Sequence, residues 1–523
     1  MKIRIIIIAL WASLLAACYE DKGNYDLVDY NKITIATVAA ETKTTVVLGE
    51  SVKITPKITW KYPERDTTEN AFDYTWIHTW GGDTIAKTRV LEYTPEECGN
   101  FTCYLYVTEK ATGVITRYQT SVTVQSPYLK GWFILSENNG KTNLNFVRRD
   151  SRKDNDNKTI YYWTDFIDLY SQLHPNDPLA SEVPVRSDAY IVGNEEDEVV
   201  IIYKGGRASV LNGLDFSKVL EIKDEFPGGV YPVGFETKQF IRGGYCDFVL
   251  GTDGKLYWRK NTNSTVMKHE QMFMNVAVYF PGGGADISEF FNINVYEANF
   301  ILGYDQLHKR FVACYTSFNS GNSYLGGKID IINPVDPTTF VDILNLDGYK
   351  LLYCGDFTDG KNYVNILKQE STGKYLMQTY KLSGGYNSLS VTNASQEEFT
   401  GSDKISDNTV FWKLRKASYL YFGEGNRLYF YDMSTKAVKL YASLPDGGNI
   451  THLMESPSSG GDYLLGVATD KGYFYLINAV DAEILGSPDP GAVGIQHQVS
   501  GLGNIKSVSW KWGGYYNLVF DRY

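Results

Sequence analysis

The chain has 523 residues, 50 of them basic and 61 acidic, and its formal net charge at pH 7 is −11. An acidic chain without a basic run is a poor candidate for binding nucleic acid, because that affinity comes mainly from neutralising phosphates, and an equally poor one for an anionic membrane surface. The length suffices for two or more domains, and 43% hydrophobic residues can bury a core.

Residues 1–17 are predicted to be a signal peptide. Lys2 and Arg4 precede an apolar run that is shorter than the roughly twenty residues of a membrane-spanning helix. Leu-Ala-Ala-Cys at residues 15–18 resembles a bacterial lipobox, so we expect cleavage before Cys18 and acylation of its thiol, with several acyl chains giving a stable anchor. An ordinary signal with a chance cysteine is the alternative. Loss of the signal changes the formal charge from −11 to −13, since two basic residues go with it.

Residues 18–32 are predicted to be a lipidated N-terminus and tether. Glu20 and Asp21 follow the cysteine closely. Acidic residues at this place resemble the surface-export signal of outer-membrane lipoproteins in the Bacteroidota, although a solvated tether would explain the same charges. The resemblance implies a lipid-anchored protein on the outer face of the outer membrane.

Residues 33–126 have the pattern of a small immunoglobulin-like β-sandwich. Short segments of alternating polarity are separated by turns that contain glycine, as strands of such a sandwich are. Trp76 is predicted to be the core tryptophan rather than a ligand-stacking residue, and His78 on the same strand face is also predicted to be structural. The segments with the clearest strand pattern are 44–58, 72–80 and 91–124.

From residue 127 onward, repetition is the strongest signal. Seven segments each contain an apolar strand, a polar turn and a second strand rich in aromatic or β-branched residues; they start at positions 132, 189, 247, 299, 350, 419 and 463. Spacings of about 44 to 69 residues fit propeller blades of four short strands with loop insertions. Residues 127–523 are therefore predicted to form a β-propeller of about seven blades, with the tail 506–523 completing the first. Six or eight blades also fit, because the long interval before position 419 could hold another hairpin.

The sequence offers little catalytic chemistry. Its six histidines are isolated from one another, and it has no G-x-S-x-G motif and no P-loop. The acidic run 194–198 is expected to be a solvated hairpin turn, with a calcium loop as the alternative. Asn176-Asp177-Pro178 resembles a box of five-bladed glycosidases, but the companion boxes of that family are missing from the propeller region, and the tripeptide also suits a plain turn. We predict no enzyme, no cofactor and no metal site.

Five cysteines remain besides Cys18. An odd number cannot form a complete disulfide framework, so we expect mostly buried thiols, while a bond between Cys98 and Cys103 stays open. The five are Cys98, Cys103, Cys246, Cys314 and Cys354.

Two segments resemble the PKD-like family lipoproteins of the Bacteroidota. They are CYEDKGNYDLVDYN at 18–31 and YLYVTEKATGVITRYQTSVTV at 104–124. The second contains an Asp/Glu-x-x-Thr-Gly turn, with Glu109 in place of the commoner aspartate. The resemblance covers about the first 125 residues and implies a PKD-like sandwich. It also implies an accessory role beside a starch-utilisation-type importer, which is a TonB-dependent barrel with a lipoprotein lid, and it brings no catalytic residues.

Together these patterns predict a surface-exposed outer-membrane lipoprotein that binds a nutrient polymer, glycan rather than peptide, and passes it to a TonB-dependent importer. One alternative is a structural or docking subunit of the importer complex that binds no ligand; a lesser one is a propeller glycosidase. Aromatic residues in loop-like contexts are the candidate ligand contacts, because sugar sites combine apolar rings with a few polar groups. A structural role is the alternative for each of them and the commoner one, since propellers bury many aromatics. They are Trp163, Tyr386, Trp512, Tyr515 and Tyr516.

Overall fold

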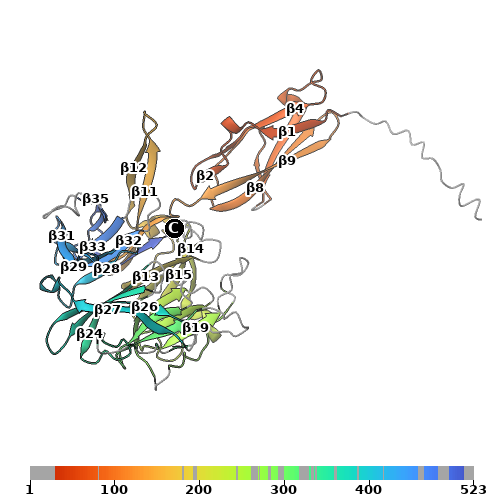
Figure 1. Ribbon diagram of the computed structural model, residues 1–523. Helices are drawn as coiled ribbons and strands as arrows, with labels where there is room; N and C mark the ends of the chain where they lie inside the picture. The colour runs from red at the N-terminus through yellow and green to blue at the C-terminus, as the bar shows by residue number, and fades with distance from the viewer. Residues whose placement is uncertain are drawn as a thin grey trace, which may run out of the picture. The chain divides into compact units, whose positions relative to one another are not determined.

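The computed structural model divides the chain into two compact units, Met1–Ser126 and Pro127–Tyr523, each with its own core (Figure 1). The residues that the structure describes are 30–79, 82–179, 182–191, 197–242, 246–260, 269, 271–280, 284–291, 300–316, 329–330, 332, 335, 339–357, 362–385, 388–415, 417–456, 464–480 and 494–511.

The first unit is a β-sandwich. Its largest sheet has the strand order β2-β9-β8-β5-β6, and two smaller sheets, β1-β4 and β3-β7, share one core with it. Trp76 is fully buried in that core and its indole N–H donates to the carbonyl of Thr88 at 3.1 Å, which confirms the prediction of a core tryptophan. The strands are β1 (Ile33–Thr37), β2 (Thr45–Val47), β3 (Val52–Ile54), β4 (Pro56–Trp60), β5 (Phe72–His78), β6 (Thr84–Ala86), β7 (Leu91–Tyr93), β8 (Gly99–Glu109) and β9 (Ile115–Gln125), with short 3-10 turns η1 (Ala39–Glu41) and η2 (Glu69–Ala71).

The second unit is a seven-bladed β-propeller. Its described residues form seven antiparallel sheets, and seven separate apolar clusters each join one sheet to the next, the last joining blade 7 back to blade 1. A complete set of neighbour contacts is what a closed ring requires. The predicted fold class, a sandwich followed by a propeller of about seven blades, is confirmed.

Each blade is a meander whose strands follow one another from the innermost outward. Blade 1 has β36 (Asn504–Lys511), β10 (Gly131–Asn138), β11 (Lys141–Lys153) and β12 (Thr159–Phe166); blade 2 has β13 (Pro184–Ile191), β14 (Asp197–Tyr203), β15 (Ala208–Asn212) and β16 (Lys218–Glu221); blade 3 has β17 (Thr237–Arg242), β18 (Cys246–Gly251) and β19 (Leu256–Lys260). Blade 4 has β20 (Ile287–Phe290), β21 (Phe300–Asp305), β22 (Arg310–Tyr315) and β23 (Ile329–Asp330); blade 5 has β24 (Tyr349–Asp356), β25 (Asn362–Gln369), β26 (Tyr375–Ser383) and β27 (Ser390–Glu398). Blade 6 has β28 (Val410–Lys413), β29 (Tyr419–Glu424), β30 (Arg427–Asp432) and β31 (Ala437–Ser443); blade 7 has β32 (Ile450–Ser456), β33 (Leu464–Thr469), β34 (Phe474–Asn478) and β35 (Ile495–Val499). Short helices are α2 (Leu169–Leu173), η3 (Ile222–Glu225), η4 (Pro227–Gly229) and η5 (Ser402–Lys404).

The ring is closed by β36, which comes from the far end of the described chain. β36 pairs antiparallel with β10 and contacts the innermost strands β13 and β32 of the two neighbouring blades. The described part of the predicted tail therefore completes blade 1, as the sequence indicates. Trp132 of β10 packs edge-on against Trp510 of β36 and Phe474 of β34, so one aromatic cluster joins the two ends of the propeller.

Stacking of blades explains why the strands have long apolar runs. On β10, Phe133 and Leu135 enter the cluster shared with blade 2, whereas Trp132 and Ile134 enter the cluster shared with blade 7. Alternate side chains of a strand point to opposite faces, and in this ring both faces are covered by another blade. A strand buried on both sides needs apolar residues at every position.

The long interval before position 419 holds no extra blade. The copy at position 350 is the first hairpin of blade 5, β24–β25, whereas the copy at position 419 is the central hairpin of blade 6, β29–β30. The strands between them finish blade 5 and begin blade 6. The shift from a first to a central hairpin lengthens the interval.

Blade 3 departs from the four-strand pattern in the described residues. Beyond β19, the segment 271–280 runs beside that strand and makes two main-chain bonds to it, from Met274 N to Trp258 O (2.9 Å) and from Val278 N to Leu256 O (2.7 Å). Two widely spaced bonds do not make a regular ladder, so this segment covers the edge of the blade without becoming a strand.

The cysteines behave as the sequence predicts. Cys103, Cys314 and Cys354 are buried unpaired thiols and Cys246 is buried, while Cys98 is half-buried. Because Cys103 is unpaired, the disulfide to Cys98 that the sequence left undecided is not formed. Burial raises the pKa of Cys103 to about 12, which keeps it protonated.

Candidate functional site

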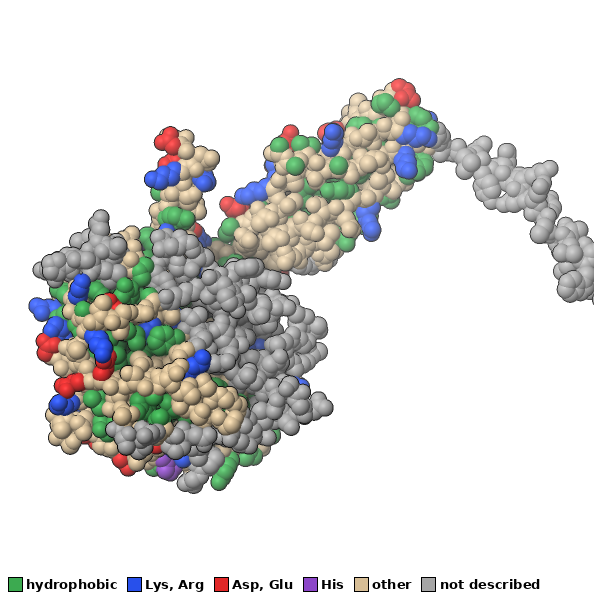
Figure 2. Space-filling view, in the orientation of Figure 1, with side chains coloured by type: hydrophobic (Ala, Val, Ile, Leu, Met, Phe, Trp, Pro, Cys, Tyr) green, Lys and Arg blue, Asp and Glu red, His purple; other side chains and the backbone are tan. Residues whose placement is uncertain are grey.

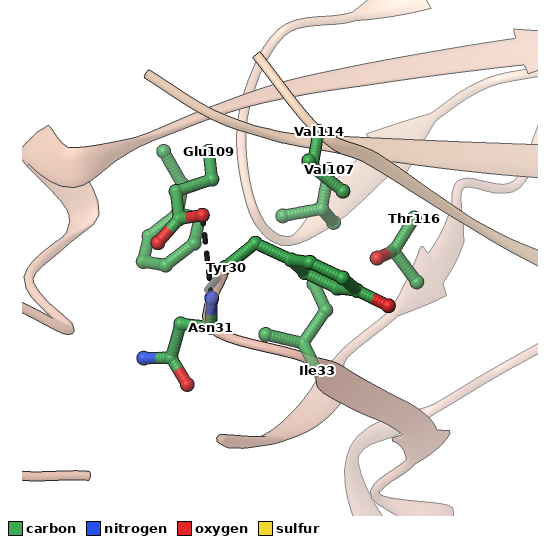
Figure 3. A pocket seen from close by; sticks show the side chains of 8 residues that line it. Tyr30, Asn31, Ile33, Val107, Glu109, Val114 and Thr116 are labelled. Carbon is green, nitrogen blue, oxygen red and sulfur yellow. Dashed lines mark hydrogen bonds between the residues drawn. The ribbon is translucent and has the colours of Figure 1, made fainter. Parts of the chain in front are cut away.

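The first candidate is a shallow hollow in the sandwich (Figure 3). It contains about 170 Å³ of empty space that opens to solvent, which is less than the ~300–1,000 Å³ of typical ligand pockets. The ring of Tyr30 lies across it, over side chains from β8 and β9. The lining residues are Tyr30, Asn31, Ile33, Phe72, Val107, Glu109, Val114 and Thr116.

Glu109 uses its hydrogen bonds to hold the wall of this hollow together. Its carboxylate accepts from the hydroxyl of Thr112 (2.5 Å) and from the main-chain N–H of Asn31 (3.4 Å). Gly113 adopts φ +70° and donates its N–H to the carbonyl of Glu109 at 2.7 Å. The Glu-x-x-Thr-Gly turn therefore fastens the first described residues onto the end of β8, and it leaves little room for a ligand.

A second candidate lies among the innermost strands of the propeller. Arg186 of β13 donates to Asp188 (2.8 Å) and to Glu289 of β20 (3.0 Å). β13 belongs to blade 2 and β20 to blade 4, so the bond between them passes in front of blade 3 and crosses the channel side of the ring. Burial raises the pKa of Asp188, although Arg186 opposes that rise. Arg186 is shared between the two carboxylates, and this pairing suits a strut between blades better than a reactive centre.

A third candidate is a network of buried charges around blade 3. Asp247 accepts from Arg242 (3.0 Å) and Arg259 (2.8 Å), and Arg259 also contacts Glu225. Burial alone would lower the pKa of His269, but Glu198 and Glu225 at its two ring nitrogens outweigh it and raise that pKa to about 9. Each buried charge thus has an opposite partner, as charges in an interior require.

This network corrects one sequence prediction. Residues 194–198 were expected to form a solvated turn, but Asp197 and Glu198 begin β14 and are only 1% and 2% exposed. Asp197 accepts from Lys511 at 2.8 Å, and Glu198 faces His269 at 3.0 Å. Partners distant in sequence let the two carboxylates be buried, and no local pattern shows them. No cluster of three or more histidine, cysteine or acidic side chains within the described residues could hold a metal ion.

A fourth candidate is the ribbon, which we define as residues 148–164 of β11 and β12 with their connecting turn. Pairing between β10 and β11 ends at Val147, whereas β11 and β12 continue to pair as far as Lys153 and Thr159. The ribbon therefore extends beyond its blade, as Figure 1 shows. β12 is also the outermost strand of its sheet.

Each face of the ribbon carries aromatic rings beside an arginine. On one face the guanidinium of Arg149 lies 3.9 Å from the ring centre of Tyr161 and 5.9 Å from that of Trp163. On the other face Arg152 lies 5.7 Å from Tyr162. Tyr161 and Tyr162 are 56% and 44% exposed, so the ribbon presents large rings to solvent on both sides. Arg152 and the tyrosines thus form a surface of aromatic and cationic groups.

The structure places one of the five predicted ligand residues. Trp163 is on the ribbon but only half exposed, because its ring stacks on His497 (5.5 Å between centroids), which in turn bonds Asp165 at 2.7 Å. Tyr161 and Tyr162 were missed, and the signal in the sequence that could have found them was the run of three consecutive aromatics that ends at Trp163. The other four predicted residues lie outside the described part of the chain: Tyr386, Trp512, Tyr515 and Tyr516.

Asp177, in the tripeptide that resembles a glycosidase box, lies in an exposed turn. Its carboxylate accepts from Lys218 at 2.7 Å, which lowers its pKa. Its main-chain N–H bonds the carbonyl of His174, as in a plain turn.

The fold and the ribbon define an all-β protein in which a β-sandwich precedes a seven-bladed propeller with a projecting aromatic arm. A model described as the PKD-like family matches residues 18–173, so the chain carries a PKD-like family domain. The match begins at Cys18 and runs past the sandwich through β12 to the end of α2. No curated protein gives a significant match.

Three solved structures illustrate the likeness of fold. A quinonprotein alcohol dehydrogenase-like protein from Bacteroides thetaiotaomicron VPI-5482 is 13% identical, with 93% of this chain and 100% of that chain covered and a TM-score of 0.38. Sqt1 of Saccharomyces cerevisiae is 12% identical over 73% and 88% of the two chains, with a TM-score of 0.37. BamB from Moraxella catarrhalis is 10% identical over 71% and 89%, with a TM-score of 0.28. Likenesses at this level carry no argument about function. No helix among the described residues is long and apolar enough to cross a membrane.

Proposed function

We propose that this protein is a lipid-anchored outer-membrane protein, exposed on the surface of a Bacteroidota cell, that binds a nutrient glycan and passes it to a TonB-dependent importer. The observation that carries the binding role is the ribbon, where Tyr161 and Tyr162 stand exposed beside Arg149 and Arg152. Flat rings flanked by polar groups suit sugar units, whose C–H faces lie on the ring while hydroxyls bond the polar groups.

The anchor is supported by two separate features of the N-terminus. The lipobox at 15–18 predicts Cys18 as the first residue of the mature chain, and the PKD-like match begins at that same residue. A domain that begins at the acylated cysteine would be held close to the membrane by the tether.

Affinity electrophoresis of residues 19–523 on a panel of polysaccharides tests the binding role. We expect at least one polymer to retard the protein, and Tyr161→Ala or Tyr162→Ala to reduce the retardation. Tyr279→Ala is the matched control, because Tyr279 is 77% exposed and lies on blade 3, far from the ribbon in sequence. If the ribbon variants leave the retardation unchanged, the glycan binds elsewhere on the protein. If no polymer retards the protein, the glycan role is refuted.

The second candidate function is a docking subunit of the importer complex that binds no glycan. One observation favours it: tyrosine, tryptophan and arginine are the residues that dominate binding energy at protein interfaces, and all three occur on the ribbon. In that case the barrel of the importer would co-purify with the wild type and be lost with Tyr161→Ala, while the polysaccharide panel gave no retardation.

A further inference from the structure

The ribbon is basic on a chain that is acidic as a whole. Residues 148–164 contain five basic and three acidic residues, whereas the whole chain has a net charge of −11. Asp150 is bonded to Arg148 at 2.7 Å, and Asp154 accepts from the main-chain N–H groups of its own turn. Three cations of the ribbon have no carboxylate partner in the part of the chain that the structure describes: Arg152, Lys153 and Lys158.

The projection of the ribbon separates these cations from the acidic body of the propeller. The six residues from Arg148 to Lys153 extend the strand by about 20 Å beyond Val147 at its usual rise per residue. Salt at physiological concentration screens charges beyond roughly 8 Å. A polyanion that approaches the outer half of the ribbon, residues 152–158, meets three basic and two acidic side chains, a net charge of +1, and little of the negative charge behind it. Figure 2 shows basic side chains on both sides of the ribbon.

The cations are placed beside rings. Arg149 lies over Tyr161 and Arg152 beside Tyr162, and the exposed Arg152 offers its guanidinium next to a flat apolar surface. A guanidinium that stacks on a ring keeps its N–H groups at the edge, where they can bind a carboxylate or sulfate with two parallel hydrogen bonds. A sugar unit that carries such a group presents an anion next to an apolar ring face. The cation beside a ring on the ribbon is therefore complementary to the anion beside a ring face on the sugar.

We propose that the ribbon binds an anionic polysaccharide, one whose carboxylate or sulfate groups bond Arg152 and Lys153 while its sugar rings stack on the exposed tyrosines. This inference rests on the proposed function, which places a glycan on the ribbon, and it names the class of that glycan.

The test compares two polymers with one backbone. Residues 19–523 are run through gels containing polygalacturonate or its methyl ester, which lacks the negative charge. We expect stronger retardation by polygalacturonate, and we expect the difference to shrink as the salt concentration rises, because bound cations release the counterions of a polyanion. The double variant Arg152→Gln/Lys153→Gln should weaken binding of polygalacturonate by about fivefold, since each exposed charge contributes a small factor.

The matched control is Lys141→Gln/Lys204→Gln, which removes the same charge from two exposed positions outside the ribbon. It should bind as the wild type does. Equal retardation by both polymers, with no effect of Arg152→Gln/Lys153→Gln, would overturn the anionic class and leave the glycan role standing. Retardation by neither polymer, together with a co-purifying protein that the ribbon variant loses, would overturn both and assign the ribbon to a protein partner.

Discussion

Trp132 joins the two ends of the propeller, and its removal should open the ring. Its indole is fully buried, with ring centres 5.1 Å from Trp510 and 5.5 Å from Phe474. Truncation of a buried tryptophan to alanine costs about 3–5 kcal/mol, from lost transfer energy and the cavity left behind. At a urea m-value of about 3 kcal/mol/M, the unfolding midpoint of the propeller would fall by roughly 1 to 1.7 M for Trp132→Ala.

The assay is urea unfolding followed by far-UV circular dichroism, with midpoints compared because two separate units need not unfold in one step. Trp163→Ala is the control: that ring is half exposed, and its loss should cost less than about 1 kcal/mol. Trp132→Phe should lie near the wild type, because it keeps a ring and removes an indole N–H that has no hydrogen-bond partner among the described residues. The reasoning is refuted if Trp132→Ala and Trp163→Ala shift the midpoint equally.

Three further predictions concern single groups. The pKa of His269 is raised from 6.5 to about 9 in the folded chain, so its contribution to stability is complete below pH 6.5 and is lost as the pH rises toward 9. Over that pH window the urea midpoint of the wild type should fall more than that of His269→Gln. Parallel curves for the two proteins would contradict the pairing of His269 with Glu198 and Glu225. Cys103, Cys314 and Cys354 should resist a thiol reagent at pH 8 until denaturant is added, because burial raises their pKa; rapid reaction in the native chain would show that these thiols are accessible. Cys18→Ala should move the protein from the membrane to the soluble fraction and abolish labelling with palmitate, and labelling that persists would show that the lipobox assignment is wrong.

The propeller could be predicted because each blade repeats the same local pattern. A hairpin must bury both faces, so an apolar strand, a polar turn and another apolar strand recur once per blade. The copy at position 350 is the first hairpin of its blade, and no local pattern separates a first hairpin from a central one. Blade 3 was harder to predict. The residues of 271–280 are as apolar as those of a strand, and yet they make only two main-chain bonds to β19.

Charged residues were the least predictable part of the sequence. Asp197 and Glu198 look like a solvated turn, since nothing near them in sequence is cationic, and their partners Lys511 and His269 lie far along the chain. Burial of such a carboxylate depends on a partner that only the closed ring supplies. The same reasoning explains why Tyr161 and Tyr162 were overlooked: the sequence shows a strand, but not that its sheet ends there.

The contrast between the buried charges of the ring and the exposed charges of the ribbon supports the proposal that the ribbon binds the ligand. Inside the ring, cations such as Arg242, Arg259 and Lys511 are bonded to carboxylates, and their side chains are nearly inaccessible. Such groups hold blades together and offer little to a ligand, because displacing their partners would leave a buried charge uncompensated. On the ribbon, Arg152 stands beside the exposed ring of Tyr162 and is itself exposed to solvent, so a ligand can bind it without breaking the fold. The ribbon presents the exposed rings of Tyr161 and Tyr162 to solvent together with Arg152, so a variant there should change binding while leaving stability nearly intact.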